Sequence, residues 1–301
     1  MTQMNVKEVW RYPVKSMRGE RLSKVRLGAR GVAGDRIWVV RGEKGEILPD
    51  RKNALSGLLN CSARYDEARD EVEITLPDAR VLRLRDGLEA EVAAALSPVV
   101  GGRAITLQRT DRTAPAPPAA SADRETVASV LKRFCKPRAE DPPFPDVGRY
   151  PEAALTGTMD YVQMYLRRNE VPPQHGFDLF PVNILTEASL RYLSRRLGKP
   201  ADVRRFRPNF LIADAANAAE RIEFAWEGKE VALGDGGAAI LCVIRCERCV
   251  MPTLAQSGPG VDLPGDGAFG PQNEGGAAYL SNYALVAHEG VVAVGDALRV
   301  A

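Results

Sequence analysis

The chain has 301 residues, of which 45% are hydrophobic and 27% are charged, a composition typical of globular domains. Its 41 Lys and Arg residues against 39 Asp and Glu residues give a net charge of +2, which argues against a general nucleic-acid-binding protein. No apolar run reaches the roughly 20 residues that a membrane-spanning helix needs, and the first ten residues lack the apolar stretch of a secretory signal, so we expect a cytoplasmic protein.

The first third of the chain is predicted to be mainly β-structure. Short apolar stretches separated by turns predict strands at 37–40, 47–48, 72–76, 81–84 and 105–108. The Gly-Glu-Lys-Gly sequence at 42–45 indicates that the first two of these strands form a hairpin. One helix is expected before the last strand, because apolar residues recur there at helical spacing, at Leu88, Val92, Leu96 and Val99.

The rest of the chain is predicted to mix helices with further strands. A proline-rich segment at 114–120 is interpreted as a linker. A helix with Thr186 as its N-cap is expected to end at Gly198. Apolar stretches predict strands at 180–185, 210–212, 222–226, 231–233, 239–244, 283–287 and 291–300. We therefore expect an α+β chain dominated by strands, with one domain at 1–112 and a second at 113–301.

Histidine and cysteine are too scarce for several kinds of catalytic site. Only His175 and His288 are present, which excludes a three-histidine zinc site within one chain. No Gly-x-Ser-x-Gly sequence supports a serine hydrolase. The five cysteines are an odd number in a long chain, which indicates free thiols in a reducing compartment rather than a disulfide framework.

Two cysteines, Cys246 and Cys249, lie where a predicted strand gives way to a loop that contains Pro252. Reactive groups are often presented where a strand ends. The neighbouring Arg245 and Arg248 are expected to lower the pKa of either thiol and so to favour a thiolate. Two half-buried cysteines without a role fit the pattern equally well. A structural zinc would need a second pair of ligands, and a thioredoxin-like site would need a helix where Pro252 stands, so neither is expected.

Polar and basic residues gather in three short segments that could bind an anion. The side chains in question are Lys15 and Ser16, then Arg36, and finally Arg205, Arg207 and Asn209. Guanidinium groups bind phosphate or carboxylate through two parallel hydrogen bonds. Each segment taken alone is equally consistent with solvated surface residues.

In combination, these motifs resemble the MOSC superfamily with an N-terminal β-barrel domain, which includes the mitochondrial amidoxime-reducing component and its bacterial relatives. The motifs that carry the resemblance lie at 12–16, 34–38, 180–190, 205–209 and 248–249. The resemblance extends from about Val6 to Val300. It implies an N-terminal β-barrel-like domain and a C-terminal MOSC β-barrel domain with peripheral helices.

The resemblance also implies a molybdenum cofactor, a pterin that carries a dithiolene and a phosphate. Cys249 would supply a sulfur ligand to molybdenum, with Cys246 nearby. The residues implied to hold the pterin and its phosphate are Lys15, Ser16, Arg36, Arg205, Arg207 and Asn209. Asp178 matches an acidic residue near the family's cofactor pocket, where it would orient the ring or relay protons, although an aspartate that only starts a turn fits as well. Pyridoxal phosphate binding is a further property attributed to this family.

Two departures from the family pattern bear on the substrate. Leu179 and Phe180 stand where reductases of the family have small hydroxylated residues. After Cys249, the family's Thr-Thr-Val-Asp-Pro-Asp type of loop is replaced by a sequence in which only Thr253 matches. We therefore expect the fold and the cofactor to be retained and the substrate pocket to differ.

The function implied by the resemblance is a molybdenum-dependent oxidoreductase that reduces N-hydroxylated or N-oxide small molecules. The sequence has neither an iron–sulfur motif nor a glycine-rich dinucleotide fingerprint, so electrons would come from a separate ferredoxin-like, flavin or haem protein. Two alternatives stay open. One is a sulfurtransferase or sulfur carrier with a persulfide on Cys249, and the other is a non-catalytic carrier of molybdopterin.

Overall fold

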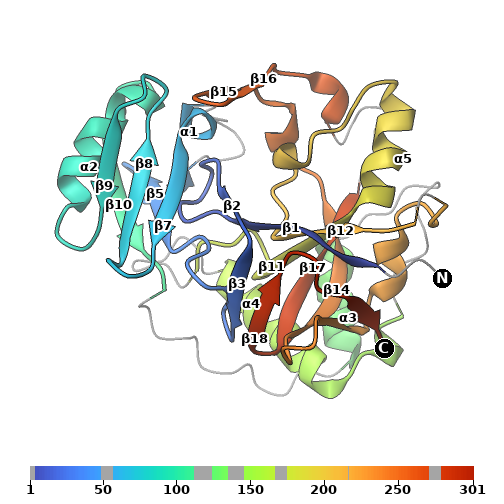
Figure 1. Cartoon of the computed structure of the whole chain (residues 1–301). Helices are drawn as coiled ribbons and strands as arrows, with labels where there is room; N and C mark the ends of the chain where they lie inside the picture. Colours follow the sequence, from blue (N-terminus) through green and yellow to red (C-terminus); the bar gives the residue numbers. More distant parts are fainter. Residues whose placement is uncertain are drawn as a thin grey trace.

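An eight-stranded mixed sheet forms the centre of the structure (Figure 1), a computed structural model that describes residues 4–48, 57–111, 124–134, 146–166, 175–215, 217–270 and 279–301. The strands in order across the sheet are β19 (Leu298–Val300), β13 (Glu230–Leu233), β14 (Ala239–Glu247), β17 (Tyr279–His288), β11 (Val182–Thr186), β12 (Phe210–Ala213), β1 (Asn5–Arg11) and β2 (Glu20–Leu22). Neighbouring strands are antiparallel except β11 and β12, which run parallel.

Four smaller sheets complete the β-structure. They contain β10 (Ile105–Arg109), β5 (Trp38–Gly42) and β6 (Ile47–Leu48); β7 (Ser62–Asp66), β8 (Glu71–Thr75) and β9 (Val81–Leu84); β18 (Gly290–Ala293), β3 (Lys24–Gly28) and β4 (Gly31–Val32); and β15 (Gln256–Gly258) with β16 (Val261–Leu263). The predicted class, α+β and rich in strands, is confirmed. Within the described ranges each sheet has two separate edge strands, so the barrel closure implied by the family resemblance is not seen there.

Two sheets combine strands from either side of the predicted domain boundary at 112/113. β1 pairs with β12, and β3 pairs with β18. Val6 and Val9 of β1 pack in one apolar core with the strands of the second half. Most of the buried apolar residues between 14 and 107 form a separate core. The division into domains at 1–112 and 113–301 stays a prediction, and the first strands belong to the sheets of the second half.

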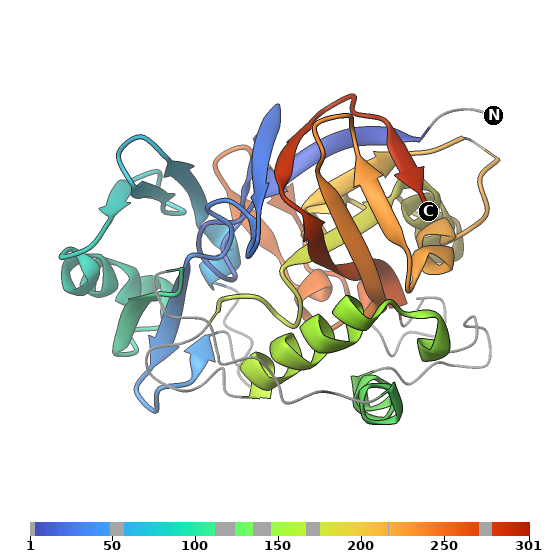
Figure 2. The same ribbon diagram turned by 90° about the horizontal axis from the view of Figure 1, so that it is seen from below.

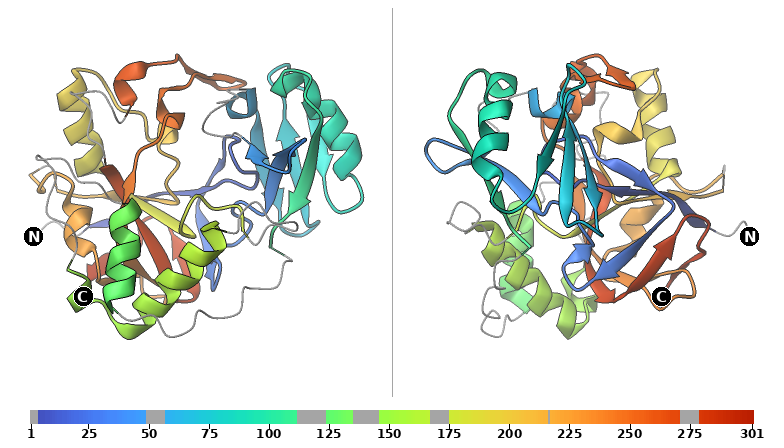
Figure 3. Two further views of the ribbon diagram at one scale, coloured as in Figure 1. Left: turned by 180° about the vertical axis from the view of Figure 1, so that it is seen from behind. Right: turned by 60° about the vertical axis from the view of Figure 1, so that its left-hand side comes forward.

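Helices cover both sides of the large sheet. The α-helices are α1 (Gly57–Asn60), α2 (Glu89–Leu96), α3 (Arg124–Phe134), α4 (Glu152–Leu166) and α5 (Glu187–Leu197). Figure 2 shows α4 lying along β14 and β17, with α3 beside it. Figure 3 shows α5 on the other side, where it packs on β11 and β12. None of the helices in the described ranges has both the length and the apolar character needed to cross a bilayer.

The local signals at α5 are confirmed by the structure. The Thr186 hydroxyl accepts a hydrogen bond from the Ser189 N–H at 3.2 Å, and Gly198 ends the helix in the left-handed conformation at φ 65°. Helix α4 lies in a part of the chain for which the sequence analysis predicted no element. The predicted linker at 114–120 lies outside the described residues.

The predicted strand at 222–226 is wrong, because these residues form one of the six 3₁₀ helices of the described chain. The six are η1 (Ser97–Val100), η2 (Val147–Arg149), η3 (Val203–Arg205), η4 (Ile222–Trp226), η5 (Met251–Thr253) and η6 (Gly267–Phe269). The chain enters η4 through Arg221 at φ 53°, and Glu223 turns inward to accept hydrogen bonds from the hydroxyls of Thr186 (2.7 Å) and Ser189 (2.6 Å). A buried polar contact therefore overrides the alternating apolar pattern.

Candidate functional site

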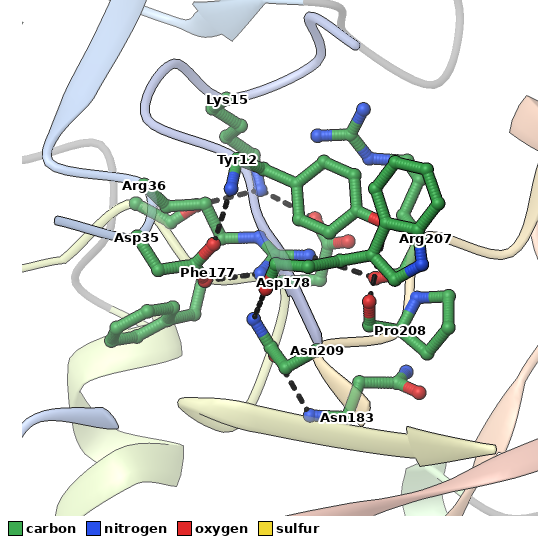
Figure 4. Close-up of polar contacts among 12 residues, drawn as sticks. Tyr12, Lys15, Asp35, Arg36, Phe177, Asp178, Asn183, Arg207, Pro208 and Asn209 are labelled. Atoms are coloured by element: carbon green, nitrogen blue, oxygen red, sulfur yellow. Dashed lines mark hydrogen bonds and ion pairs between the residues drawn. The ribbon is translucent and has the colours of Figure 1, made fainter. Parts of the chain in front are cut away.

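Three cationic side chains from distant parts of the chain converge on one carboxylate (Figure 4). Lys15 forms an ion pair with Asp178, and its Nζ also donates to the Gly176 carbonyl at 3.0 Å. The charges of Arg36 and Arg207 act on the same carboxylate, and Arg36 Nη2 donates to the Arg207 carbonyl at 3.3 Å. We call Lys15, Arg36, Asp178 and Arg207 the basic cluster.

The ring of Tyr12 holds the two arginines in place. Arg207 lies 4.4 Å and Arg36 lies 4.9 Å from the ring centroid, so both guanidinium groups make cation–π contacts with it. The Tyr12 N–H donates to Asp35 at 2.7 Å, and its hydroxyl donates to the Pro208 carbonyl at 3.1 Å (Figure 4). Burial raises the pKa of Tyr12 above its ordinary value despite both arginines, so the phenol stays a neutral donor.

An uncommon backbone conformation is shared by three residues at the site. Ser16, Arg36 and Arg207 have φ values of 71°, 49° and 54°, a left-handed region in which residues other than glycine are uncommon. Such residues persist only where surrounding contacts fix them, and they concentrate at functional sites. The buried Ser16 hydroxyl donates to the Leu48 carbonyl at 3.3 Å, so its side chain supports the turn.

The cluster carries more positive than negative charge. Lys15, Arg36 and Arg207 contribute three positive charges, Asp178 removes one, and Asp35, which adjoins the cluster and pairs with Arg36, removes another, so the cluster together with Asp35 carries +1. Among the described residues, Arg207 has no carboxylate within ion-pair distance, and its guanidinium donates to the Met17 carbonyl. Burial, assisted by the neighbouring Arg36, lowers the pKa of Arg207 to about 10.

Burial and neighbouring charges shift the pKa values of the other ionisable groups of the cluster. Burial lowers the pKa of Lys15, and Asp178 opposes that effect. Burial also lowers the pKa of Arg36, but Asp35 and Asp178 outweigh it and the net direction is upward. For Asp178, the surrounding protein groups displace water and so raise the pKa, but the charges of Lys15, Arg36 and Arg207 outweigh that effect, so the net direction is downward. Its side chain is 65% exposed, so an ionised carboxylate faces solvent within a ring of cations.

The two cysteines lie at the end of β14, close to Asp178. Partial burial, with smaller contributions from the charges of Cys249 and Asp178, raises the pKa of Cys246 to about 12. The prediction that Arg245 and Arg248 lower the pKa of Cys246 is therefore wrong. Arg245 instead pairs with Glu227 through Nε (2.8 Å) and Nη2 (2.6 Å), and Arg248 Nη1 donates to the Phe269 carbonyl at 2.6 Å. Cys246 and Cys249 are both partly exposed.

One aromatic residue near the cysteines was not predicted. Tyr283 of β17 hydrogen-bonds with Cys246, and burial, followed by the charges of Cys246 and Asp178, raises its pKa well above the ordinary value. It lies opposite Asn183 of β11 and packs on Phe180, with ring centroids 5.9 Å apart. Only the pairing of β17 with its neighbours brings it to the site, so no sequence pattern could have identified it.

Two of the predicted cofactor-binding residues support the backbone instead of joining the basic cluster. The buried Arg205 donates to the carbonyls of Pro252 (3.1 Å), Leu254 (3.3 Å) and Pro264 (2.7 Å), which are in the loop after Cys249. Asn209 accepts from the Asn183 N–H at 3.1 Å and donates to the Trp10 carbonyl at 3.4 Å, so it links β11 with β1. Both side chains position segments that carry the site.

The departures from the family pattern lie mainly beneath the site. Leu179 and Phe180 are 6% and 3% exposed and pack in a core with α4.

Thr253, the one residue of the loop after Cys249 that matches the family pattern, donates to the Val250 carbonyl at 2.7 Å, within η5. In the described residues no group of three or more His, Cys, Asp and Glu side chains could hold a metal ion by itself.

Comparison with known proteins gives two family matches. Residues 3–114 match the MOSC N-terminal beta barrel domain, and residues 172–299 match the MOSC domain. The chain is similar to mitochondrial amidoxime-reducing component 1 of Mus musculus, with 26% identity over 254 residues, 83% of this chain and 65% of that protein. It is also 26% identical, over 256 residues, to mitochondrial amidoxime reducing component 2 of Bos taurus, covering 83% and 66% of the two chains. It therefore spans just under two thirds of the length of these curated relatives.

Solved structures are more distant. The YUAD protein from Bacillus subtilis aligns over 99% of this chain and 96% of its own, with 10% identity and a TM-score of 0.40. YiiM from Geobacillus stearothermophilus aligns over 40% and 54%, with 16% identity and a TM-score of 0.28. The two family matches lie in the expected order and cover most of the sequence, and the chain belongs to the family of proteins in which a MOSC N-terminal beta barrel domain precedes a MOSC domain.

Proposed function

We propose that this chain binds a molybdenum cofactor at the basic cluster and reduces N-hydroxylated or N-oxide small molecules. The observation that carries the proposal is the half-buried guanidinium of Arg207, which has no carboxylate partner among the described residues and lies where the cluster and the adjoining Asp35 together carry an excess charge of +1. A phosphate would supply the missing negative charge. The names of the relatives, amidoxime-reducing components, agree with an N-oxygenated substrate.

The donor set fits the cofactor. Lys15, Arg36 and Arg207 would hold its phosphate, and the partly exposed thiol of Cys249 is the soft ligand that a sulfur-rich metal centre favours. When bound, the cofactor supplies the two-electron redox chemistry. Asp178 is exposed beside Lys15, so its carboxylate would hold or pass a proton at the substrate. Ser16, Arg205 and Asn209, which the family resemblance assigned to the cofactor, would shape the site through the backbone contacts described above.

The electron donor is inferred from motifs that the sequence lacks. Since the sequence has no iron–sulfur or dinucleotide motif, we propose a separate ferredoxin-like, flavin or haem protein as the donor. Pyridoxal phosphate also carries a phosphate and would compete for the same cations. The cytoplasm stays the predicted location, whereas the names of the relatives place those proteins in mitochondria.

Elemental analysis with pterin fluorescence tests the proposal. Protein purified from a host that makes the cofactor should contain molybdenum and pterin in equal amounts. Arg207→Ala should lower the pterin content at least tenfold, whereas Arg204→Ala should not, because Arg204 pairs with Asp202 outside the cluster. Cys249→Ala should keep pterin and lose N-oxide reduction.

The other outcomes separate the alternatives. Wild-type protein without molybdenum from such a host would contradict the proposal. A persulfide on Cys249 in metal-free protein, detected by mass spectrometry, would favour a sulfur carrier or sulfurtransferase. Tight pterin binding without reduction of any N-oxide by any donor would favour a non-catalytic carrier.

A further inference from the structure

The loop after Cys249 carries the β15–β16 hairpin, residues 256–263, which we call the arm. The arm pairs with no other strand of the described chain, and none of its residues belongs to one of the apolar cores found there. A two-stranded hairpin without a core is at best marginally stable in water by itself. The position of the arm therefore depends on the contacts at its base and at its tip.

The base of the arm is tied to the second half of the chain. Arg205 donates to backbone carbonyls on both sides of the arm, as described above. The Asp266 N–H donates to the Thr253 carbonyl at 2.7 Å, so the chain that enters the arm is joined to the chain that leaves it. Asp266 also forms an ion pair with Lys199, just after α5. The arm can therefore turn only where it joins this base.

The outer part of the arm meets the first third of the chain through three hydrogen bonds, which we call the latch. The Ser257 N–H and hydroxyl both donate to Asn60 Oδ1, at 2.8 and 3.2 Å. Arg18 Nη1 donates to the Pro259 carbonyl at 3.4 Å. Ser257 is exposed and Asn60 is partly exposed, so water can replace these bonds when the arm leaves.

The two arginines that hold the arm lie on the two segments that carry the basic cluster. Arg18 follows Met17, whose carbonyl accepts a hydrogen bond from Arg207. Arg205 precedes Arg207 by two residues. Figure 1 shows the arm above β1, with its tip at α1 and its base on the side of α5. The arm therefore bridges the two halves of the chain next to the segments that form the cluster.

We propose that the arm is a gate that swings about its base when the latch opens, and that the open state admits a phosphate-bearing ligand to the basic cluster. The motion stands on the contacts above, whereas the identity of the ligand rests on the proposed function. The latch opens before the base because it has few contacts, all of them polar and reached by water. A gate changes how fast a ligand enters and leaves but not how tightly it binds, because the arm is closed both with and without the ligand.

Hydrogen exchange read by mass spectrometry on the purified full chain tests the motion. Asn60→Ala removes the acceptor of two latch hydrogen bonds, so exchange in residues 256–263 should accelerate at least about fourfold, since each neutral bond changes an equilibrium about two- to twelvefold. Residues 264–270 should exchange as in the wild type. Ser257→Ala removes only the hydroxyl's bond and should give a smaller acceleration. It also keeps the test available if Asn60→Ala does not fold.

Two further variants separate the latch from a general effect of substitution. Asn60→Asp keeps the acceptor oxygen and adds charge, which strengthens its hydrogen bonds, so exchange in the arm should be no faster than in the wild type. Asp262→Asn is the matched control. Asp262 is exposed on the other strand of the arm, opposite Ser257, and takes no part in the latch, so its substitution should leave the exchange unchanged.

Stopped-flow fluorescence with neopterin phosphate, a fluorescent pterin that carries a phosphate, tests the gate. In Asn60→Ala the association and dissociation rate constants should rise by the same factor, at least about fourfold, and Kd should stay within about twofold of the wild-type value. If Asn60 contacted the ligand directly, Kd would rise instead and the association rate constant would change little.

Three results would overturn the proposal. The first is equal exchange of residues 256–263 in Asn60→Ala and in the wild type. The second is an equal acceleration in residues 264–270, which would place the motion outside the arm, and the third is a raised Kd with an unchanged association rate constant. A wild-type chain that does not bind neopterin phosphate would contradict the proposed function, and hydrogen exchange would still decide whether the arm opens.

Discussion

Arg207→Met is expected to stabilise the ligand-free chain while removing its affinity for phosphate. The half-buried guanidinium makes no ion pair among the described residues and lies beside Arg36, so its charge is unfavourable until an anion arrives. Methionine has a similar length and no charge. A gain in stability from the removal of a polar residue is typical of a site that is organised for a ligand.

The size of the effect follows from the structure. A fall in the pKa of Arg207 from 12.5 to about 10 corresponds to about 3 kcal/mol against the charged form. The variant loses the hydrogen bond to the Met17 carbonyl and the cation–π contact with Tyr12, each worth about 1 kcal/mol. The net expectation is a rise of about 1 kcal/mol in the free energy of unfolding, or about 2–4 °C in Tm.

Urea unfolding at pH 7 measures this change, and thermal unfolding with and without 10 mM phosphate measures the ligand effect. Phosphate should raise the Tm of the wild type and leave that of Arg207→Met unchanged. Arg204→Met is the matched control, because Arg204 forms a half-exposed ion pair with Asp202 and should change stability by less than about 0.5 kcal/mol. Destabilisation of Arg207→Met by more than about 1 kcal/mol would refute the reasoning and make Arg207 a structural residue.

Three further predictions concern other parts of the chain. Burial raises the pKa of Glu223 above its value of 4.5 in the unfolded chain, so the folded state holds the proton more strongly and the free energy of unfolding falls as pH rises above 4.5. Glu223→Gln should flatten that fall when the free energy is measured by urea unfolding. An unchanged dependence of the free energy on pH would contradict the raised pKa of Glu223. With its pKa raised by burial to about 12, Cys246 has a thiolate fraction of about one in ten thousand at pH 8. Peptide mapping should therefore find iodoacetamide on Cys249 and not on Cys246, and equal labelling would count against the raised pKa of Cys246. Gly258→Ala would place a Cβ 2.7 Å from Arg18 Nη2 and 2.8 Å from the Asn60 carbonyl oxygen, and it should lower the free energy of unfolding by about 1–3 kcal/mol. Gly260→Ala, whose Cβ would have nothing within 4 Å, should lower it by about 1 kcal/mol. Equal losses of stability in the two variants would exclude the close contact as the cause.

The sequence predicted the elements whose signals are local. Thr186 and Gly198 marked the ends of α5 correctly, because a cap depends on residues within one turn of it. The strand predicted at 222–226 failed because Glu223 finds its partners 34 and 37 residues away, on α5 and at its N-cap. Sequence periodicity contains no information about such distant contacts.

The sequence also predicted only part of the candidate site. Residue type and order singled out Lys15, Arg36, Arg207 and Cys249, but not how they are arranged. The prediction that neighbouring arginines activate a thiol failed for Cys246, and Arg245 instead pairs with Glu227, 18 residues earlier in the segment before β13. Charge in the sequence shows which groups are available, and only the strand pairing shows which groups meet.

The strand pairing also explains why the excess positive charge persists. β1 pairs with β12 in the large sheet, and the Trp10 N–H donates to the Asn209 carbonyl at 2.8 Å, so Tyr12 and Arg207 are held at the same edge. The Arg36 N–H donates to the Tyr12 carbonyl at 2.7 Å, which fixes the second arginine to the same segment. Because backbone bonds fix these positions, the cations cannot separate to relieve their repulsion. The cost of bringing them together is met during folding, and an arriving anion gains the attraction without reorganising the site.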